Sequence, residues 1–296
     1  MEEFNPKLSI VTPTYNRGGL LNNCYRSLLK QTNRNFEWII VDDGSVDDTQ
    51  EIAKGFQSGL FSIVYVKKEN GGKHTALNAS HPYIRGNFVL ILDSDDTLTE
   101  TAVEEVLLHW ERFQDDASVG VITFLRATPD GRPFCAVKNY EVPVDMQTYP
   151  RIVYLGNDCC EVIRADLFLK YPFPVFKGER FLSEGVLWNR VARTHKCVYI
   201  DKAIYLCEYL EDGLTKAGRA MRIHNPRGGM LSSSLGMERR CGFRCRIKSG
   251  LLYCCYGFFA GLKMCDIVGK TKNKTISVIC MLPGYLLYRY WQAKYW

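Results

Sequence analysis

The chain has 296 residues, of which 46% are hydrophobic and 24% are charged, and its net charge is +6. This composition is ordinary for a globular protein, and the length suits one large domain or a domain with an appendage. The 12 cysteines include no CxxC pair in a chain that is long for a disulfide-stapled scaffold, so we expect reduced thiols in a cytosolic compartment. The polar and acidic segment Met1–Lys7 does not fit a secretory signal peptide.

Short apolar runs rich in β-branched residues alternate with helical patterns over the first 125 residues. The expected strands are Leu8–Thr12, Trp38–Val41, Ile63–Val66, Phe88–Leu92 and Val119–Phe124. Strands separated by helices in this rhythm predict an α/β fold, with a mostly parallel sheet covered by helices on both faces. Ligands bind such sheets beyond the carboxyl ends of the strands.

Helical patterns occupy the intervals between these strands. In the first interval the apolar side chains recur at helical spacing, and they are Leu21, Cys24, Tyr25, Leu28 and Leu29. Ser45 and Asp48 predict a capping box that opens the second helix. Thr99 predicts the cap of a third helix, which runs to Trp110.

Four polar motifs follow the first four expected strands. They are TPTYNR (Thr12–Arg17), VDDGS (Val41–Ser45), NGGKHTALN (Asn70–Asn78) and LDSDD (Leu92–Asp96). Because the carboxyl ends of parallel strands share one edge of a sheet, we expect the four motifs to converge there. Taken alone, VDDGS also fits a plain Asp-Gly turn before a capped helix.

The LDSDD motif leads a buried strand directly into a cluster of carboxylates. Asp93, Asp95 and Asp96 repel one another unless water or a cation separates them. Two carboxylates at positions i and i+2 can hold Mg²⁺ or Mn²⁺ together with the phosphate oxygens of a substrate. The same residues also fit a solvated turn before a helix, where acids are favoured, and a DXD motif is short and common by chance.

Taken together, VTPTYNR, IIVDDGSVDDT, ENGGKHTALN and LILDSDD resemble, in this order and spacing, the family 2 glycosyltransferases of the GT-A fold. Bacterial surface-polysaccharide enzymes are especially similar. The resemblance is strong over Leu8–Trp110 and weaker through Gly178–Arg190 and Asp212–Thr215. It implies a GT-A catalytic domain over residues 1–238 that takes a sugar from a nucleotide-sugar donor, UDP-linked, and transfers it to a glycan or lipid-linked acceptor.

The resemblance also implies which residues bind the nucleotide sugar. Pro13 and Tyr15 would flank the nucleoside. Asp43, the second acid of VDDGS, would accept a hydrogen bond from the base. Lys73 stands where family members often carry a basic residue against the nucleotide, and Asp93 would face the ribose or the metal.

A metal ligand and a general base complete the implied site. Asp95 would ligate a divalent cation, manganese or magnesium, directly, with Asp93 beside it. Glu184 stands at the position of the catalytic base, which would activate the acceptor hydroxyl on the face opposite the leaving group and so invert the anomeric centre. The sequence departs from the commoner acidic pair, because Ser183 replaces the first acid and the second is Glu. Glu184 also fits a first-turn acid favoured by the helix dipole, with Ser183 as the cap.

The charge of the chain is unevenly distributed. Lys216–Trp296 carries 15 Lys/Arg against two Asp/Glu, a net charge of +13, whereas Met1–Thr215 carries −7. Within the basic part, Ser249–Leu262 and Thr275–Tyr288 are uncharged stretches of 14 residues each, too short for an ordinary membrane-spanning helix of about 20 residues. Three glycines at positions 250, 257 and 261 weaken the first stretch as a helix.

Basic residues beside apolar and aromatic ones favour a segment that lies in an anionic membrane interface. We therefore expect residues 239–296 to associate with the membrane and to hold a cytoplasmic enzyme peripherally on the inner face of the cell membrane. The same composition fits nucleic-acid binding, but no nucleic-acid motif accompanies it. A third interpretation is an apolar helical layer that packs on the catalytic domain or on a second subunit.

Two other functions remain compatible with the sequence. A metal-dependent sugar nucleotidyltransferase would share the sheet and the metal-binding acids but would not need a base such as Glu184. A non-catalytic nucleotide-sugar binding subunit would keep the nucleotide contacts only, and the presence of Asp93, Asp95 and Glu184 argues against it.

Overall fold

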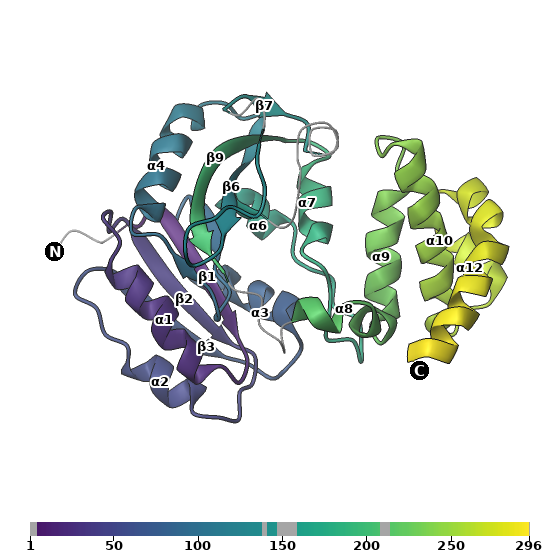
Figure 1. Ribbon diagram of the computed structural model, residues 1–296, viewed down its shortest axis with the longest axis horizontal. Helices are drawn as coiled ribbons and strands as arrows, with labels where there is room; N and C mark the ends of the chain where they lie inside the picture. Colours follow the sequence, from purple (N-terminus) through teal and green to yellow (C-terminus); the bar gives the residue numbers. More distant parts are fainter. Residues whose placement is uncertain (1–4, 138–140, 147–158, 208–213, 296) are drawn as a thin grey trace. The chain divides into compact units, whose positions relative to one another are not determined.

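The computed structural model describes residues 5–137, 141–146, 159–207 and 214–295 (Figure 1). The chain forms two compact units, residues 1–173 with 190–208, and residues 174–189 with 209–296. The domain boundary expected after residue 238 falls inside the second unit, between α9 (Pro226–Gly236) and α10 (Phe243–Phe259). These two helices pack against each other, so no break in the structure accompanies the change in composition.

The first unit contains a sheet with the strand order β3-β2-β1-β4-β8-β6-β9-β5, and β7 pairs with β9. The strands are β1 (Leu8–Thr14), β2 (Phe36–Asp42), β3 (Ser62–Lys67), β4 (Phe88–Ile91), β5 (Thr97–Leu98), β6 (Val119–Ala127), β7 (Pro143–Val144), β8 (Cys160–Arg164) and β9 (Lys196–Leu206). All five strands expected from the sequence are present, with ends displaced by up to three residues.

The part of the sheet that carries the four motifs is parallel, as predicted. β3, β2, β1 and β4 run side by side in the same direction, and Ile10 of β1 lies opposite both Trp38 of β2 and Leu90 of β4. Beyond β4 the sheet becomes mixed, because β8 runs antiparallel between β4 and β6. The carboxyl ends of β1 to β4 therefore share one edge, where polar loops can gather around a ligand.

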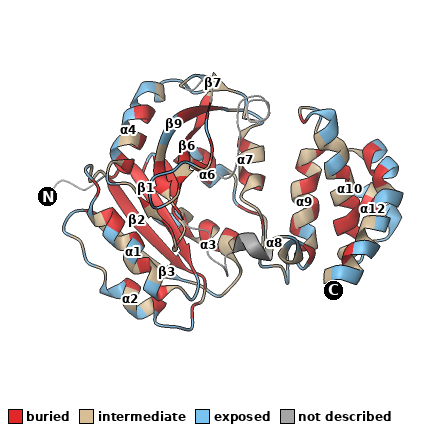
Figure 2. Ribbon diagram, in the orientation of Figure 1, coloured by how far each residue is buried: buried red, intermediate tan, exposed pale blue. Residues whose placement is uncertain are grey.

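Helices cover both faces of the sheet (Figure 1). On one face lie α1 (Gly18–Leu29), α2 (Thr49–Gly55) and α4 (Ala102–Phe113), and on the other lie α3 (Lys73–Ser80) and α6 (Ala165–Lys170), with a 3-10 turn at His81–Tyr83. Leu8 and Ile10 of β1 pack into one buried cluster with Leu21 of α1 and Trp110 of α4. The strands β1, β2, β4 and β6 are buried along most of their length (Figure 2), which fixes the register of the sheet and the position of the loops at its edge.

Two expected helix starts are wrong. The second helix begins at Thr49 rather than near Ser45, because the Ser45 hydroxyl accepts a hydrogen bond from the backbone N–H of Asn16 at 2.9 Å. The third begins at Ala102, and its N-cap residue is Thr101, not Thr99. In both places a side chain with capping chemistry lies in the connection before the helix, so its spacing misled the prediction.

The second unit is helical. It contains α8 (Leu214–Ile223), α9, α10, α11 (Met264–Gly269) and α12 (Lys274–Tyr295), while α7 (Gly185–Val191) begins in this unit and ends in the first. The first uncharged stretch of the sequence forms most of α10, whose residues Tyr253 to Tyr256 are buried. Within the described ranges, no helix is long and apolar enough to cross a membrane.

The glycines of α10 serve close packing and do not prevent the helix from forming. A Cβ atom added at Gly250 would lie 2.5 Å from Ile276 of α12, and one at Gly284 of α12 would lie 2.6 Å from the Cβ of Cys254. The small residues therefore let α10 and α12 approach each other closely. The packing gained there outweighs the lower helix propensity of glycine.

Candidate active site

The four motif loops contact one another at the carboxyl edge of the parallel strands. The loop after β1 reaches the loop after β4 through an ion pair of 2.7 Å between Arg17 and Asp95. The loop after β3 reaches the same place through an ion pair between Lys73 and Asp93. The predicted convergence of the motifs is therefore confirmed.

Asp93 and Asp95 follow β4 directly and remain accessible. β4 ends at Ile91, and Leu92 is still fully buried. The side chains of Asp93 and Asp95 are 25% and 24% exposed, respectively. The buried strand thus carries the two carboxylates to the rim of the sheet, where a ligand can reach them.

The three acids of this turn have different electrostatic surroundings. Burial raises the pKa of Asp93, but Lys73 and Arg126 outweigh burial and hold this pKa below its ordinary value. Burial raises the pKa of Asp96 to about 7, and the negative charge of Asp93 acts in the same direction. Asp93 is therefore the acid that is kept ionised by its neighbours, and Asp96 is the one that resists ionisation.

Tyr205 of β9 supports the turn that carries Asp93 and Asp96 through two hydrogen bonds. The backbone N–H of Asp93 donates to the Tyr205 hydroxyl at 2.9 Å, and that hydroxyl donates to Oδ2 of Asp96 at 2.8 Å. The guanidinium of Arg126 lies 4.2 Å from the centre of the Tyr205 ring. Sequence reasoning missed Tyr205 and Arg126, because both lie in strands far along the chain and carry no motif.

We expect Tyr205→Phe to lower the free energy of unfolding by roughly 1–3 kcal/mol, because it leaves a partly buried donor and a buried acceptor unpaired. Urea denaturation followed by circular dichroism measures this. Tyr83→Phe, which removes the hydroxyl of an exposed tyrosine in the same unit, is the matched control. Equal stability of the two variants would mean that the hydroxyl of Tyr205 does not support the turn.

Asp43 has a structural task in addition to the predicted one. Its Oδ1 accepts hydrogen bonds from Gly71 N–H at 3.0 Å and from the Lys68 amine at 2.6 Å, and its Oδ2 accepts one from Gly72 N–H at 2.6 Å. The side chain is only 5% exposed. Asp43 thus fixes the loop that carries Lys73, and its contact with a base stays a prediction.

The loop after β1 presents Tyr15 and holds a strained residue. Pro13 is buried within β1, whereas Tyr15 is exposed at the edge of the sheet. Asn16 adopts a left-handed conformation with φ of 51°. Its backbone N–H donates a hydrogen bond to the Ser45 hydroxyl at 2.9 Å, and its side-chain oxygen accepts one from the Val46 N–H at 2.9 Å. These two hydrogen bonds offset the strain. The contacts of Pro13 and Tyr15 with a nucleoside stay predictions.

Comparison with known proteins agrees with this arrangement. Residues 9–142 match the family model described as glycosyl transferase family 2. Glycosyltransferase GlyA of Streptococcus pneumoniae is 35% identical over 38% of this chain, and minor teichoic acid biosynthesis protein GgaB of Bacillus subtilis is 32% identical over 41%. An uncharacterized glycosyltransferase of Rickettsia typhi is 36% identical over 72% of the chain.

Residues 9–142 of this chain form a glycosyltransferase family 2 domain.

The chain spans different shares of these relatives. It covers 16% of GlyA, 14% of GgaB and 66% of the Rickettsia typhi protein. Among solved structures, S. aureus TarS in complex with UDP-GlcNAc superposes with a TM-score of 0.66 at 18% identity, over 90% of this chain and 77% of that one. The mannosyltransferase PcManGT of Pyrobaculum calidifontis, in complex with GDP-Man and Mn²⁺, gives 0.59 at 14% identity, over 98% and 83%. The predicted GT-A-like fold is thereby confirmed.

Glu184, the predicted base, lies directly before α7 in the second unit. Its carbonyl oxygen accepts hydrogen bonds from the N–H groups of Leu187 at 2.8 Å and Trp188 at 3.3 Å. The hydroxyl of Ser183 accepts one from Gly185 N–H at 3.3 Å. These contacts agree with the helix-start interpretation, and the role of Glu184 as base stays a prediction.

The acids of the site fit a divalent cation that is shared with a substrate. Among the residues that the structure describes, no group of three or more His, Cys, Asp or Glu side chains could hold a metal ion by itself. Mg²⁺ and Mn²⁺ need only one or two carboxylates when substrate phosphates and water supply the other ligands. Asp93 and Asp95 are two such carboxylates, and each already attracts a cationic side chain.

Proposed function

We propose that this chain is an inverting glycosyltransferase that transfers a sugar from a UDP-linked donor to a glycan or lipid-linked acceptor in bacterial surface-polysaccharide synthesis. The observation that carries the proposal is the pair Asp93 and Asp95 directly after buried β4, where the four motif loops meet. The family match over residues 9–142 supports it, because this range contains all four loops. GgaB, a teichoic acid biosynthesis protein, supports the class of product.

The donor would lie over the carboxyl ends of β1 to β4. Pro13 and Tyr15 would flank the nucleoside, and Asp43 would accept a hydrogen bond from the base. Lys73 would supply positive charge to the nucleotide, and it already lies beside Asp93. The complex of TarS with UDP-GlcNAc supports a uridine nucleotide as the donor group.

Asp95 would ligate manganese or magnesium directly, with Asp93 facing the same ion or the ribose. When bound, the cation would neutralise the diphosphate leaving group. The complex of PcManGT with Mn²⁺ supports a divalent cation. The protein's own contribution is to hold both carboxylates on a rigid turn, through the hydrogen bonds of Tyr205 to the Asp93 backbone and to Asp96.

Glu184 would act as the general base. A carboxylate takes the proton of the acceptor hydroxyl as the hydroxyl attacks the sugar from the side opposite the diphosphate. One base and one displacement invert the anomeric centre. The partial exposure of Glu184 before α7 supports this role, because a general base must be accessible to the acceptor hydroxyl.

The enzyme would work peripherally on the inner face of the cell membrane, where a lipid-linked acceptor is available. The net charge of +13 over Lys216–Trp296 supports this location, because anionic lipids attract basic segments. The buried core of α10 argues that only part of the predicted segment, residues 239–296, faces a membrane.

Isothermal titration calorimetry with UDP, GDP and dTDP, each with and without Mn²⁺, tests the donor site. We expect one nucleotide, UDP, to bind more tightly in the presence of Mn²⁺, because the cation links the diphosphate to Asp95. Equal UDP affinity with and without the metal would contradict the proposed site.

A further inference from the structure

The outward face of α12 is apolar, although it is exposed. Ile276, Cys280, Gly284 and Trp291 are buried on the inner face. The opposite face carries side chains spaced four residues apart, and Val278, Leu282, Leu286 and Tyr290 are 57–68% exposed. A helix at the surface of a globular protein normally places polar residues on that face. α12 is therefore apolar on both faces, and α10 covers only one of them.

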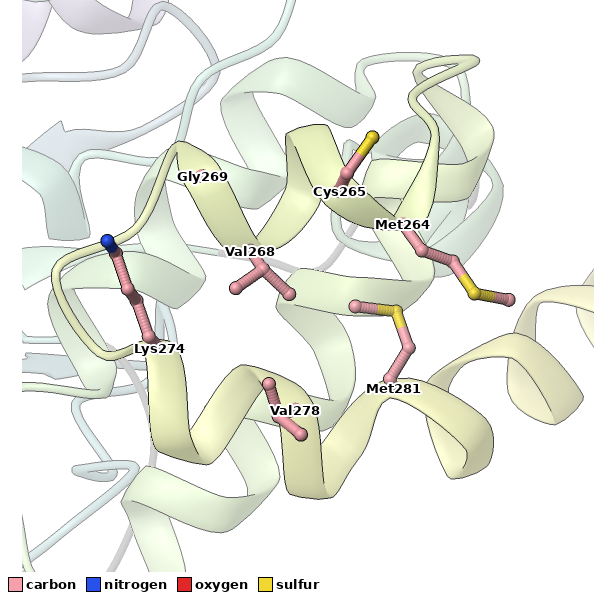
Figure 3. Close-up of a pocket in the computed structure, with 7 residues that line it drawn as sticks. All are labelled: Met264, Cys265, Val268, Gly269, Lys274, Val278 and Met281. Carbon is pink, nitrogen blue, oxygen red and sulfur yellow. The ribbon is translucent and has the colours of Figure 1, made fainter.

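An apolar groove between α11 and α12 extends this surface (Figure 3). It has a volume of about 460 Å³ and is lined by Met264, Cys265, Val268, Gly269, Lys274, Val278 and Met281. The side chains of Met264, Val268, Val278 and Met281 gather around the groove, and Lys274 lies at one end (Figure 3). Val278 belongs to both the groove and the exposed stripe. The two together form one surface, which we call the α12 face.

Basic residues border the α12 face. The exposed cations in this part of the chain are Lys270, Lys272, Lys274, Arg289 and Lys294. From Ile267 to Trp296 the sequence contains no Asp or Glu. An exposed apolar surface of this kind marks an interaction site, and its border of cations specifies an anionic partner.

We propose that the α12 face docks on an anionic lipid bilayer, with its apolar stripe and groove against the acyl chains and its lysines and arginines among the headgroups. This deepens the proposed membrane location and does not depend on the sugar that is transferred. A second copy of the chain fits less well, because a twofold contact would bring the cationic borders of the two copies together. A bilayer satisfies the apolar surface and the charge at the same time.

Two double variants separate the apolar contribution from the charge. Leu282→Gln with Leu286→Gln removes apolar contact at exposed positions, and Lys272→Gln with Lys274→Gln removes two cations. Leu108→Gln, at an exposed leucine of α4 in the first unit, is the matched control. Sedimentation is measured with vesicles of phosphatidylcholine alone and with vesicles that also contain phosphatidylglycerol, at low and high salt.

We expect the wild type and Leu108→Gln to sediment with phosphatidylglycerol vesicles. The leucine variant should bind these vesicles at least roughly tenfold more weakly, because two leucine side chains are no longer transferred from water into the bilayer. The lysine variant should lose affinity and also salt dependence. Wild-type protein that ignores the vesicles, or a leucine variant that binds like the wild type, overturns the proposal. A dimer seen by analytical ultracentrifugation without lipid, and abolished in the leucine variant, would assign the face to a second copy.

Calorimetry with UDP and Mn²⁺ on the same samples keeps the two proposals distinguishable. The leucine variant should bind UDP like the wild type, because α12 lies outside the residues proposed for the donor. Loss of vesicle binding with intact UDP binding confines the effect to the membrane contact. Vesicle binding without UDP binding would reject the donor site and leave the docking proposal standing.

Discussion

Replacing Asp95 with asparagine is expected to lower sugar transfer by roughly a thousandfold, the scale of several kcal/mol of charge stabilisation by a metal ion. The variant should also lose the tighter UDP binding in Mn²⁺, because an amide is a poorer ligand for a hard cation. The fold should survive, since the side chain lies outside the core and is 24% exposed. Nucleoside diphosphate release and calorimetry measure the two effects.

Asp130→Asn is the matched control for this variant. Asp130 forms an ion pair of 2.8 Å with Arg132 at an exposed turn. The Asp130→Asn variant therefore removes an Asp–Arg ion pair but leaves the proposed metal site unchanged. We expect its activity to equal that of the wild type. If Asp95→Asn retains metal-dependent UDP binding, its carboxylate serves only the ion pair with Arg17, and the metal assignment is wrong.

Glu184→Gln is expected to preserve donor binding and to lower turnover by about two to four powers of ten, the usual contribution of a general base. Glutamine keeps the size of the side chain and the helix start, so the structural role before α7 is largely retained. Steady-state kinetics should show the loss in kcat, with little change in UDP affinity by calorimetry.

The control for Glu184 is Glu111→Gln, at an exposed position of α4, which should leave the kinetics unchanged. Near-normal turnover in Glu184→Gln would show that this residue only begins a helix.

Much of the first unit could be predicted from the sequence, because its strands are short apolar runs between helices. Leu8, Trp38 and Leu90 are buried in strands as expected, and the loops after those strands meet at one edge. The path from β4 into Asp93 and Asp95 was also predictable, since a core strand that ends in acids needs a compensating positive charge. The structure supplies part of that charge from Arg17 and Lys73.

The supports of the site could not be predicted, because they come from distant segments. Tyr205 reaches Asp93 and Asp96 across more than 100 residues of sequence, and its position depends on the pairing of β9 with β5. Lys68, which forms an ion pair with Asp43, lies just before the motif that contains Lys73, so the motif did not indicate it. Such contacts depend on the three-dimensional packing of strands, which local residue patterns do not encode.

The helical unit shows a different limit of sequence reasoning. Glycine lowers helix propensity locally, yet Gly250 and Gly284 are points of close contact between α10 and α12, and both helices form. The two uncharged stretches also differ in burial: the one in α10 is largely buried, whereas the one in α12 is buried on one face only. Uncharged composition alone could not tell these apart, because each is apolar around most of its circumference.

Proton NMR of the product formed from an α-linked UDP-sugar with Mn²⁺ tests the central claim most directly, because it reports donor use, cleavage and stereochemistry in one experiment. The proposed site predicts release of UDP and a first-formed product with the β configuration at the anomeric carbon. A first-formed α product would contradict single displacement by a base such as Glu184. Absence of UDP release from every donor, in protein that binds UDP with Mn²⁺, would make the chain a binding subunit.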